Sequence, residues 1–466
     1  MEKPSRELNS KSWIMPLPDE VRQVIDTLES AGHEAWVVGG CVRDALLGHV
    51  PQDYDITTSA KPQEVQELFE KTIPTGIKHG TVTVMINHQP LEVTTYRVEE
   101  DYKDHRHPEQ VRFVSNIDED LARRDFTINA MAWHPQRGLR DPFGGQKDLE
   151  AGIIRAVGDP YLRFEEDALR MFRAWRFAGR FGFDLDPETE KAIEHCTPYA
   201  RGLSAERVRA ETEKIMKDSP RILDHLTRLL QFWIPQLEQM RQTEQNSPYH
   251  YTDVWHHTLD ALCTLDEWDP TVYWAVLLHD SGKPKVKTTD NGRDHFKRHE
   301  IASAKIAAGV FNRMHFPKKM AKDAVKLIEK HDAFYAPRLN SLYKLRVKAG
   351  FDDELVEKLF RVQQADILAH AIQDRQQQLN TFKAFYEKEK TQVPLSVGEL
   401  KVNGQDAMEL TELPKASIGH ALQNVLQTVI CHPQWNTRES QIKLLKQTAE
   451  QMEKETEENK EKKEKQ

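Results

Sequence analysis

The hydrophobic and polar positions of this chain follow two different patterns. Up to about residue 150, short runs rich in Val, Ile, Thr and Tyr lie between glycines or prolines, and such runs predict β-strands: AWVVGG, YDITT, GTVTVMI and LEVTTYR. Between them, VRQVIDTLES and PQEVQELFEK have the apolar spacing of helices. After residue 150 the strand signals stop, and segments such as SAERVRAETEKIMKD have helical spacing. The pattern therefore predicts an α+β head followed by an all-helical remainder.

Changes in this pattern divide the 466 residues into parts. Residues 391–405, TQVPLSVGELKVNGQ, interrupt the helical spacing and are predicted to be a linker. The end after Met452 is almost entirely Glu and Lys, so it is predicted to be a solvated helix or disordered. The predicted parts are a mixed head over 20–150, a helical neck over 151–220, a helical body over 221–390, a helical tail over 391–452 and a charged end over 453–466.

Composition and charge exclude several classes of protein. No apolar run approaches the ~18 residues that span a bilayer, and the first twenty residues lack the apolar core of a secretory signal, so we expect no membrane partner. The four cysteines are widely spaced, which argues against a disulfide framework or a thiolate zinc site and favours a reducing cytoplasm. The formal net charge is -9, so a nucleic-acid partner would need a local positive patch.

The clearest local signal is GGCVRDALLGHVPQDYDI, residues 39–56. Gly39 and Gly40 follow a predicted strand and precede a predicted helix, so the backbone there could approach a phosphate closely and offer free N–H groups. Arg43 lies in the first turn of that helix and could clamp a triphosphate.

Two carboxylates follow this turn. Asp53 and Asp55 flank one residue at the start of a predicted strand, and alternate residues of a strand face the same side. Such a pair repels unless it shares cations, which predicts two hard divalent ions and in-line nucleotidyl transfer. The alternative is an exposed acidic turn after Pro51. Glu92, on a later predicted strand, is either a third carboxylate of this site or a solvent-facing residue.

GGxxRD followed by DxD resembles the nucleotidyltransferase superfamily of polymerase-beta type. The longer pattern resembles the family of class II tRNA nucleotidyltransferases and bacterial poly(A) polymerases, over residues 20–215. DEDLARRDFTINAMA, residues 118–132, resembles that family's second motif, and DPFGGQKDL, residues 141–149, resembles its hinge. The resemblance implies a polymerase-beta-like head with Mg²⁺ at Asp53 and Asp55. It also implies four further nucleotide contacts: Arg123, Arg124, Asp125 and Asn129.

The segment Glu166-Asp167-Ala168-Leu169-Arg170 resembles the family's nucleobase-reading motif, EDxxR. Asp167 only accepts hydrogen bonds and Arg170 only donates them, and on one helix they would lie on neighbouring faces. Cytosine and adenine present an amino donor beside a ring-nitrogen acceptor, which this pair can satisfy, whereas uracil and guanine present a carbonyl and an N–H. The motif therefore predicts CTP and ATP as substrates. The alternative is an ordinary i,i+3 ion pair.

Farther along, the neck is rich in charged residues. Arg173 and Arg176 continue the same predicted helix, and with Arg180 they predict a positive stripe for triphosphate or RNA backbone. SAERVRAETEKI resembles the family's fifth motif, whose charged residues are expected to hold the neck helices together: Glu206, Arg207 and Glu211.

Two other segments are interpreted by resemblance alone. Residues 96–110, YRVEEDYKDHRHPEQ, lack periodicity and resemble the family's flexible loop, which implies addition of A, either after CC or alone. The final segment, LKVNGQDAMELTELPKASIGHALQNVL, resembles the family's C-terminal unit and indicates a helical contact with the body of tRNA.

A second cluster of candidate ligands lies in the helical body. LLHDSGKP contains a His-Asp doublet, and further His and Asp residues lie on predicted helices before and after it. The arrangement resembles the HD-domain metal phosphohydrolases and implies a transition-metal site, since imidazole and carboxylate together suit Mn, Ni, Zn or Fe. His299 and His331 could make the site dinuclear. The candidate ligands are His257, His279, Asp280, His299, His331 and Asp366.

These patterns together predict a cytoplasmic enzyme that adds C and/or A to the 3′ end of tRNA without a template, using CTP, ATP and Mg²⁺ and releasing pyrophosphate. One alternative is a poly(A) polymerase with the same head. Another is a hydrolase in which the HD-type site acts on RNA ends. A third is a non-catalytic RNA-binding protein, against which the intact DxD and EDxxR argue. The choice among CCA, CC and A as product depends on pocket and loop geometry, and no oligomeric state is predicted.

Overall fold

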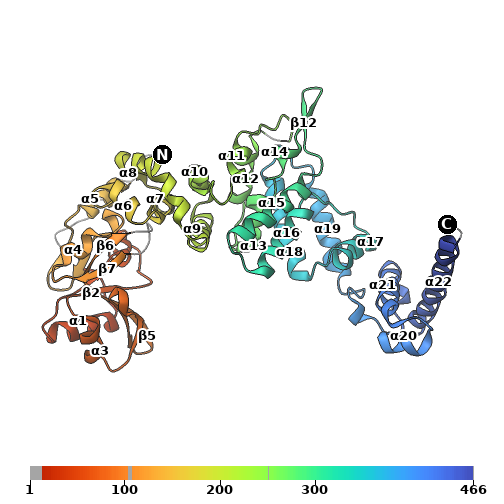
Figure 1. Ribbon diagram of the computed structural model, residues 1–466, viewed down its shortest axis with the longest axis horizontal. Coiled ribbons are helices and arrows are strands. Elements are labelled where there is room, and N and C mark those ends of the chain that lie inside the picture. Colours follow the sequence, from red (N-terminus) through yellow and green to blue (C-terminus); the bar gives the residue numbers. More distant parts are fainter. Residues whose placement is uncertain (1–12, 103–107, 250, 465–466) are drawn as a thin grey trace. The chain divides into compact units, whose positions relative to one another are not determined.

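The computed structural model of the protein describes residues 13–102, 108–249 and 251–464 (Figure 1), with side chains for all of these except 99–102, 108–110 and 456–464. The chain forms two compact units. The first contains residues up to Glu238 together with Arg313–His315, and the second contains Gln239–Asn312 and the residues from Phe316 onward. The limits of the five parts expected from the sequence remain predictions.

A mixed seven-stranded sheet is the centre of the head, in the order β3-β4-β5-β2-β1-β8-β9. β2 and β5 pair in parallel, and the other neighbours in this sheet are antiparallel. β6 and β7 form a separate antiparallel pair. The strands are β1 Ala35–Val38, β2 Asp55–Thr58, β3 Thr72–Gly76, β4 Thr81–Ile86, β5 Gln89–Thr95, β6 Arg97–Tyr102, β7 Pro108–Phe113, β8 Ala132–His134 and β9 Gly138–Arg140.

Short helices pack against this sheet, with α1 and α2 contacting β1 and α3 contacting β4 and β5. All four residues of β1 are buried, as expected for a strand that is covered on both faces. The buried positions of α1, Val21, Val24, Ile25 and Leu28, follow helical spacing. The helices of the head are α1 Asp19–Ser30, α2 Gly40–Leu46, α3 Pro62–Leu68, η1 Ile77–His79, α4 Ile117–Ala122, η2 Thr127–Asn129 and α5 Gly145–Ala151.

The neck is built around α7, which packs on α9 and η4. Gly179 of α7 has no room for a Cβ, because Ile222 and Ser219 lie against it, and this allows α7 to approach η4 closely. The neck elements are β10 Ile153–Ile154, α6 Pro160–Glu166, α7 Leu169–Phe181, β11 Asp184–Leu185, α8 Pro187–Cys196, η3 Thr197–Gly202, α9 Ala205–Asp218, η4 Pro220–Leu226 and α10 Thr227–Leu230; α11 Gln236–Arg241 lies at the boundary between the two units.

The second unit is helical around α13, whose residues Thr271–Leu278 are all buried between α12, α16 and α18. A helix that is apolar all round is expected at such a centre. The elements here are α12 Val254–Cys263, α13 Pro270–Leu278, α14 Lys283–Val286, β12 Thr288–Asp290, β13 Arg293–His295, α15 His299–Arg313, α16 Lys318–Lys330, α17 Leu339–Leu342, the π-helical η5 Tyr343–Lys348, α18 Asp353–Leu368 and α19 Gln376–Glu389.

The expectation of an all-helical chain after residue 150 is wrong in two places. β10 and β11 form a short parallel pair, and β12 and β13 form a hairpin. These strands contain two or three residues each, which is too short for an alternating pattern to stand out in the sequence.

The C-terminal elements form a helical tail in which α21 packs on α22. Asn403 caps α20, because its Oδ1 accepts from the N–H groups of Gln405 and Asp406, while Asp406 accepts from the N–H of Asn403. The charged end continues α22 as far as Glu464. The elements are η6 Val397–Glu399, α20 Gly404–Leu410, α21 Lys415–Cys431, η7 Pro433–Trp435 and α22 Arg438–Glu464. Within the described residues, every helix is too short or too polar to cross a bilayer.

Candidate active site and candidate metal centre

The acidic pair of the head lies at the start of a central strand. β2 begins at Asp55, and Asp53 lies two residues before it, outside the strand. Both residues are exposed, so their carboxylates are open to ligands from solvent. Partial burial and repulsion from Asp53 raise the pKa of Asp55, against the attraction of Arg124. The two carboxylates therefore interact electrostatically.

Glu92 lies directly across from Asp55. The register of the parallel strands β2 and β5 pairs the two residues, and paired residues project to the same side of a sheet. Of the two interpretations that the sequence left open, this register favours a third carboxylate at the site. In the described part of the chain, Asp53, Asp55 and Glu92 do not converge into a closed group of ligand atoms.

The Gly39-Gly40 turn lies next to Asp55, because Asp55 pairs with Val38, the last residue of β1. Gly39 has a φ of 80° and stands directly before α2. A Cβ at Gly39 would lie 2.8 Å from Nη1 of Arg124. Glycine is therefore needed both for the backbone conformation and for the close approach of this guanidinium.

Arg43 is buried, and its donors are used inside the head. Its Nη1 donates to Asn129 Oδ1 at 2.6 Å, and its Nε donates to Asp44 Oδ1 at 2.8 Å. Its guanidinium carbon lies 5.2 Å and 4.9 Å from the ring centroids of Phe177 and Phe181. Burial lowers the pKa of Arg43. In this arrangement Arg43 positions Asn129 against α7, and its predicted contact with a triphosphate stays a prediction.

Asp120, which the sequence reasoning did not single out, organises the second motif. It is fully buried, accepts from Nη2 of Arg123 at 2.7 Å and lies 3.5 Å from Nη2 of Arg124. Burial would raise the pKa of Asp120, but the two arginines lower it. The available signal was its position three and four residues before the arginines, which is helical spacing.

Asp125 is a second buried carboxylate of this motif. Its Oδ1 accepts from Nδ2 of Asn129 at 3.0 Å, and its Oδ2 lies 2.6 Å from Nη2 of Arg173. Burial alone would raise the pKa of Asp125, but Arg173 and Asn129 lower it to about 2. An ionised Asp125 thus joins the second motif to α7.

The predicted base-reading pair does not share one helix. α6 ends at Glu166 and α7 begins at Leu169, so Asp167 lies in the break, where its Oδ1 accepts from the N–H of Leu169 at 3.1 Å. Oδ2 of Asp167 accepts from Nη2 of Arg207 at 2.8 Å, whereas Nη1 of Arg170 donates to Glu166 at 2.7 Å. The prediction that both residues lie on one helix is wrong, because the helix is broken at Asp167. The alternative of an ordinary Asp167–Arg170 ion pair is also wrong, because Asp167 pairs with Arg207 and Arg170 pairs with Glu166.

The positive stripe predicted on α7 is largely neutralised. Arg173 is paired with Asp125, and Arg176 forms an ion pair with Glu211 in which Nε and Oε2 are 2.9 Å apart. Arg180 is exposed. Buried carboxylates from other elements thus compensate the charges of Arg173 and Arg176, and the contact of this stripe with triphosphate or RNA stays a prediction.

Two of the three charged residues expected to hold the neck helices together, Arg207 and Glu211, contact other parts of the neck, whereas Glu206 contacts His315 after α15. Arg207 contacts Asp167, and Glu211 contacts Arg176. Glu206 Oε1 lies 2.6 Å from Nδ1 of His315.

Five residues of the predicted flexible loop, 103–107, lie outside the described residues, and they include Asp104, Arg106 and His107. Its flanks form β6 and β7, and β7 begins at Pro108. The expected lack of regular structure over 96–110 is wrong for these flanks, because β6 and β7 pair with each other. The pairing is made by backbone hydrogen bonds, and the polar side chains of this segment carry no alternating pattern that would predict it.

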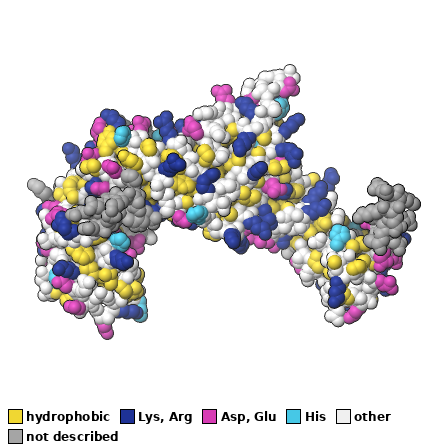
Figure 2. All heavy atoms as spheres, in the orientation of Figure 1, with side chains coloured by type: hydrophobic (Ala, Val, Ile, Leu, Met, Phe, Trp, Pro, Cys, Tyr) yellow, Lys and Arg dark blue, Asp and Glu magenta, His cyan; other side chains and the backbone are white. Residues whose placement is uncertain are grey.

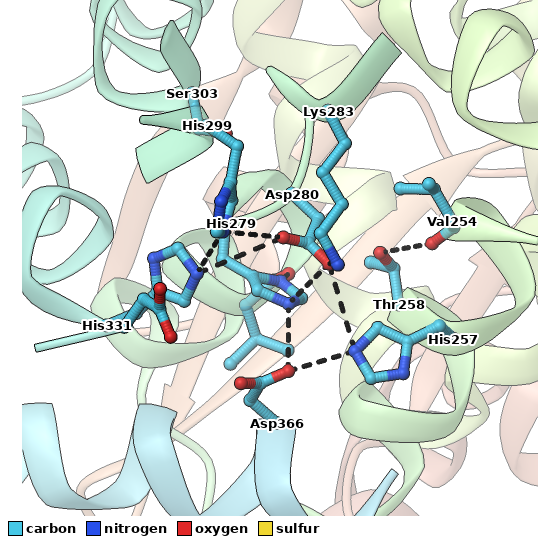
Figure 3. Close-up of polar contacts among 12 residues, drawn as sticks. Val254, His257, Thr258, His279, Asp280, Lys283, His299, Ser303, His331 and Asp366 are labelled. Atoms are coloured by element: carbon cyan, nitrogen blue, oxygen red, sulfur yellow. Dashed lines mark hydrogen bonds and ion pairs between the residues drawn. The ribbon is translucent and has the colours of Figure 1, made fainter. Parts of the chain in front are cut away.

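Six His and Asp side chains converge in the second unit (Figure 3). All six are buried. They are His257 of α12, His279 and Asp280 directly after α13, His299 of α15, His331 directly after α16, and Asp366 of α18.

Asp280 lies between two groups of possible ligands. Its Oδ2 is 3.3 Å from Nε2 of His279, and its Oδ1 is 3.3 Å from Nε2 of His299. The groups share Asp280 and otherwise contain His257, His279 and Asp366 in one and His299 and His331 in the other. A carboxylate whose two oxygens face different groups can bridge two metal ions.

The imidazole rings are held with their Nε2 atoms toward this centre. Nδ1 of His279, His299 and His331 each lies within 2.9 Å of a backbone carbonyl oxygen, to which it donates. Each Nε2 then presents a lone pair that can bind a metal, and the Nε2 atoms of His299 and His331 lie 3.1 Å apart. In the described part of the chain, Nε2 of His279 and Oδ1 of Asp280 are buried without a well-formed hydrogen bond, whereas Oδ2 of Asp280 forms an ion pair with Lys283. Such atoms are costly unless a ligand satisfies them, so this donor set fits a metal.

Lys283 and His370 also belong to this centre, although the sequence reasoning passed over them. Nζ of Lys283 lies 2.6 Å from Oδ2 of Asp280. His370 stacks on His257 with ring centroids 5.0 Å apart, and its Nε2 lies 3.8 Å from Oδ1 of Asp366. Lys283 follows Asp280 by three residues in HDSGK, and this spacing was a usable signal.

A cavity of about 410 Å³ opens onto this cluster of His and Asp side chains. Lys283, Lys297, Arg375 and Tyr249 contribute to its lining, together with the carboxylates of the centre. Positive side chains beside a group of potential metal ligands suit a phosphate-bearing ligand.

Three protein-family models match the chain. The model described as "Poly A polymerase head domain" matches residues 35–155. The model described as "Probable RNA and SrmB- binding site of polymerase A" matches residues 182–241, and the "HD domain" model matches residues 254–374. The chain therefore contains a poly(A) polymerase head domain, a segment that matches the RNA-binding model and an HD domain. The resemblance and the fold class expected from the sequence are confirmed.

Curated relatives and solved structures are similar to this chain. The CCA-adding enzyme of Lactobacillus helveticus is 52% identical over 202 residues, which are 43% of this chain and 51% of the relative. The CCA-adding enzyme of Leuconostoc mesenteroides is 47% identical over 209 residues, or 44% of this chain and 52% of the relative. The chain thus spans about half the length of the curated relatives it matches.

Among solved structures, the Bacillus stearothermophilus CCA-adding enzyme in complex with CTP has a TM-score of 0.68 and 28% identity, covering 95% of this chain and 98% of that one. The Thermotoga maritima CCA-adding enzyme complexed with tRNA has the same fold, with a TM-score of 0.58 and 21% identity over 92% of this chain and 96% of that one.

Replacing Asp125 by Asn should lower the free energy of unfolding by about 2 kcal/mol at pH 7, because the ionised carboxylate is stabilised by Arg173. The folded-state pKa of Asp125 is below that of the unfolded chain, so this stabilisation is complete above about pH 4 and is lost as the pH falls toward 2. Urea unfolding followed by tryptophan fluorescence should show about half of the difference at pH 3.

The matched control is Asp118→Asn, which removes a partly exposed carboxylate paired with the exposed Arg140 and should change stability by less than about 1 kcal/mol. An Asp125→Asn protein as stable as the wild type at pH 7 would contradict the importance of this pair.

Proposed function

We propose that the protein adds C, A or both to the 3′ end of tRNA without a nucleic-acid template, using CTP and ATP and releasing pyrophosphate. The observation that carries this proposal is the placement of Asp53, Asp55 and Glu92 around the parallel β2–β5 pair, next to the Gly39 turn. The curated relatives are CCA-adding enzymes, which supports tRNA as the acceptor and favours this activity over poly(A) synthesis.

Mg²⁺ is the cofactor that we propose for the head. Asp53 and Asp55 are exposed and repel one another, so they fit a shared hard cation. Bound there, Mg²⁺ would activate the attacking 3′ hydroxyl and stabilise the leaving pyrophosphate. Glu92 would add a carboxylate on the same side of the sheet.

Arg124 is the arginine best placed for the triphosphate. Its Nη1 lies against Gly39, and its charge acts on Asp55. As the 3′ oxygen bonds to the α-phosphorus and the bond to pyrophosphate breaks, a guanidinium there would attract the departing charge. Arg123 is instead turned toward Asp120, so its role is to position the motif.

Asp167 and Arg170 retain enough hydrogen-bonding capacity to read a base. A carboxylate has about four acceptor positions, and two of those on Asp167 are used by Leu169 and Arg207. A guanidinium has five donors, and Arg170 uses three, toward Glu166 and two backbone carbonyls. These bonds fix both side chains while leaving an acceptor and a donor for the edge of cytosine or adenine.

The cytoplasm is the compartment that we propose. All four cysteines are free thiols: Cys41, Cys196, Cys263 and Cys431. A reducing compartment keeps thiols in this state.

Asp55→Asn should lower nucleotide incorporation by about 1,000-fold, because it removes a carboxylate that would hold Mg²⁺. The assay supplies tRNA ending in the discriminator base, in C or in CC, with labelled CTP and ATP separately and together. Addition of A only to the CC-ended tRNA would identify an A-adding enzyme, whereas long A tails on unrelated RNA would identify a poly(A) polymerase.

The control for that assay is Asp26→Asn, which removes an exposed carboxylate of α1 and should leave incorporation near the wild-type rate. Full activity of Asp55→Asn would refute the proposed site. Binding of tRNA without any incorporation by the wild type would favour a non-catalytic RNA-binding protein.

Arg170→Ala should relax discrimination against UTP and GTP by about 10- to 100-fold, because a donor to the base edge is lost. Arg163→Ala is a matched control, since Arg163 also contacts Glu166 but is not proposed to touch the base. Relative kcat/KM values for the four nucleotides measure the effect. If both variants select nucleotides like the wild type, Arg170 does not read the base.

A second candidate function, hydrolysis of phosphate esters at RNA ends, is supported by the buried cluster of the second unit. Asp280 faces both groups of possible ligands, and Lys283 lies beside it at the cavity. A divalent transition metal bound there would polarise the ester and acidify an attacking water. Lys297 and Arg375 would attract the phosphate.

The HD-type centre should bind two Mn²⁺ ions in the wild type, one in His331→Ala and none in Asp280→Asn, because Asp280 belongs to both groups. Isothermal titration on metal-stripped protein measures the stoichiometry. All of these proteins should also carry Asp55→Asn, so that metal bound at the head does not add to the measured stoichiometry.

His256→Ala is the control, because this neighbour of His257 pairs with Asp253 outside the cluster, and it should bind both ions. Metal binding by Asp280→Asn equal to that of the wild type would exclude this centre. Hydrolysis of phosphate at RNA ends that survives Asp55→Asn but is abolished by His279→Ala, in a wild type that incorporates no nucleotide, would make the second unit the main catalyst.

A further inference from the structure

A basic groove lies on the second unit, outside the segment 182–241 that the RNA-binding family model matches and without lining residues in common with the HD-type cavity. Its volume is about 510 Å³, and it lies between α16 and η5. Four lysines contribute to its lining, and we call it the lysine groove: Lys326, Lys330, Lys344 and Lys348. Figure 2 shows Lys and Arg side chains gathered on this unit near α17.

The segment that forms the lysine groove has a charge opposite to that of the whole chain. Residues 317–350 contain nine Lys and Arg but three Asp and Glu, a balance of +6, whereas the chain has a formal net charge of -9. A negatively charged protein repels a polyanion at long range, so a polyanionic partner must be met by such a local field.

Two of the four groove lysines are held by neutral groups, so their charge is not cancelled. Nζ of Lys326 donates to the carbonyl oxygen of Gly350 at 2.6 Å and lies 5.6 Å from the ring centroid of Phe351. Nζ of Lys348 lies 5.9 Å from the ring centroid of Tyr343. A carbonyl or an aromatic face orients an ammonium but leaves its positive charge and its other donors available.

Carboxylates compensate little of this charge. Lys330 pairs with Glu329, which is itself exposed. For Lys344 and Lys348, which are exposed and four residues apart, the described part of the chain provides no carboxylate partner. Residues at this spacing share a helix face, so two uncompensated ammonium groups project from the same side.

We propose that the lysine groove binds the phosphate backbone of the RNA on whose 3′ end the head acts. The inference rests on the proposed function, in which the enzyme acts on tRNA. A protein with a net charge of -9 needs a local positive surface to hold that polyanion. Flexible lysines act as point charges toward phosphates and do not read sequence, so the groove would add affinity without base specificity.

The test compares Lys344→Ala/Lys348→Ala with Lys305→Ala/Lys388→Ala, which removes the same charge from exposed positions of the same unit outside the groove. Equilibrium binding of tRNA lacking its terminal CCA is measured in the full chain at several KCl concentrations. The groove variant should reduce the slope of log K against log salt by about 1.5, whereas the control variant should leave it near the wild-type value. KM values for CTP and ATP should not change in either variant, and thermal unfolding checks that both are folded.

Equal slopes of log K against log salt in the wild type and the groove variant would overturn the inference. The partner of the groove would then be an acidic protein surface and not RNA. Equal losses in the groove and control variants would also overturn it, because they would reflect total charge alone. Failure of the proposed function is distinguishable, since the wild type would then bind tRNA with a groove-dependent slope but incorporate no nucleotide.

Discussion

The ion pair between the buried Asp125 and the partly exposed Arg173 is the interaction on which the arrangement of the head's site depends. It connects the second motif to α7, with Nη2 of Arg173 2.6 Å from Oδ2 of Asp125. Two other arginines make parallel connections, since Arg43 lies over rings of α7 and Arg170 of α7 donates to the carbonyl oxygen of Arg123. Removing one partner of a buried pair leaves an uncompensated charge, so α7 cannot move away from the motif at low cost. The proposed base-reading side chain is thereby held at a fixed position relative to Asp55.

The same principle explains why the neck is rich in arginine without presenting a positive face. A guanidinium forms several directed hydrogen bonds at once, so it can join elements that are distant in sequence. Arg176 and Arg207 connect α7 and the α6–α7 break to α9 in this way. The side chains left for ligands in the head are consequently few, and Arg124 is the one that lies against the glycine turn. The net attraction for RNA must come from other surfaces, and the lysine groove is one.

Features set by short stretches of sequence could be predicted, whereas the partners of long side chains could not. The strands at Ala35–Val38 and Asp55–Thr58 follow from β-branched residues bounded by glycine or proline, and the glycine turn follows from its place between strand and helix. The partners of Arg43 and Arg173 are 86 and 48 residues away, and no local pattern chooses among the many carboxylates and amides of this chain. The break at Asp167 was missed because its cause, capping of Leu169 by the Asp167 side chain, competes with a helical pattern that continues through it. The HD-type ligands were found because His-Asp after an apolar run is uncommon, while Lys283 was missed because a lysine is ordinarily solvated.

The two candidate metal centres differ in a way that matches the chemistry proposed for each. The carboxylates of the head are exposed, and the register of β2 and β5 brings Glu92 to the side of Asp55 without closing a cage. An open, all-oxygen site suits Mg²⁺, which keeps water ligands and is completed by substrate phosphates. The centre of the second unit is the opposite, because its imidazoles are buried and fixed by carbonyl acceptors before any metal arrives. Preorganised nitrogen ligands favour a transition metal that stays bound through turnover. Burial and ligand type therefore separate the two proposed metals: the one at the head would exchange with its nucleotide, and the one in the second unit would stay in its own cavity.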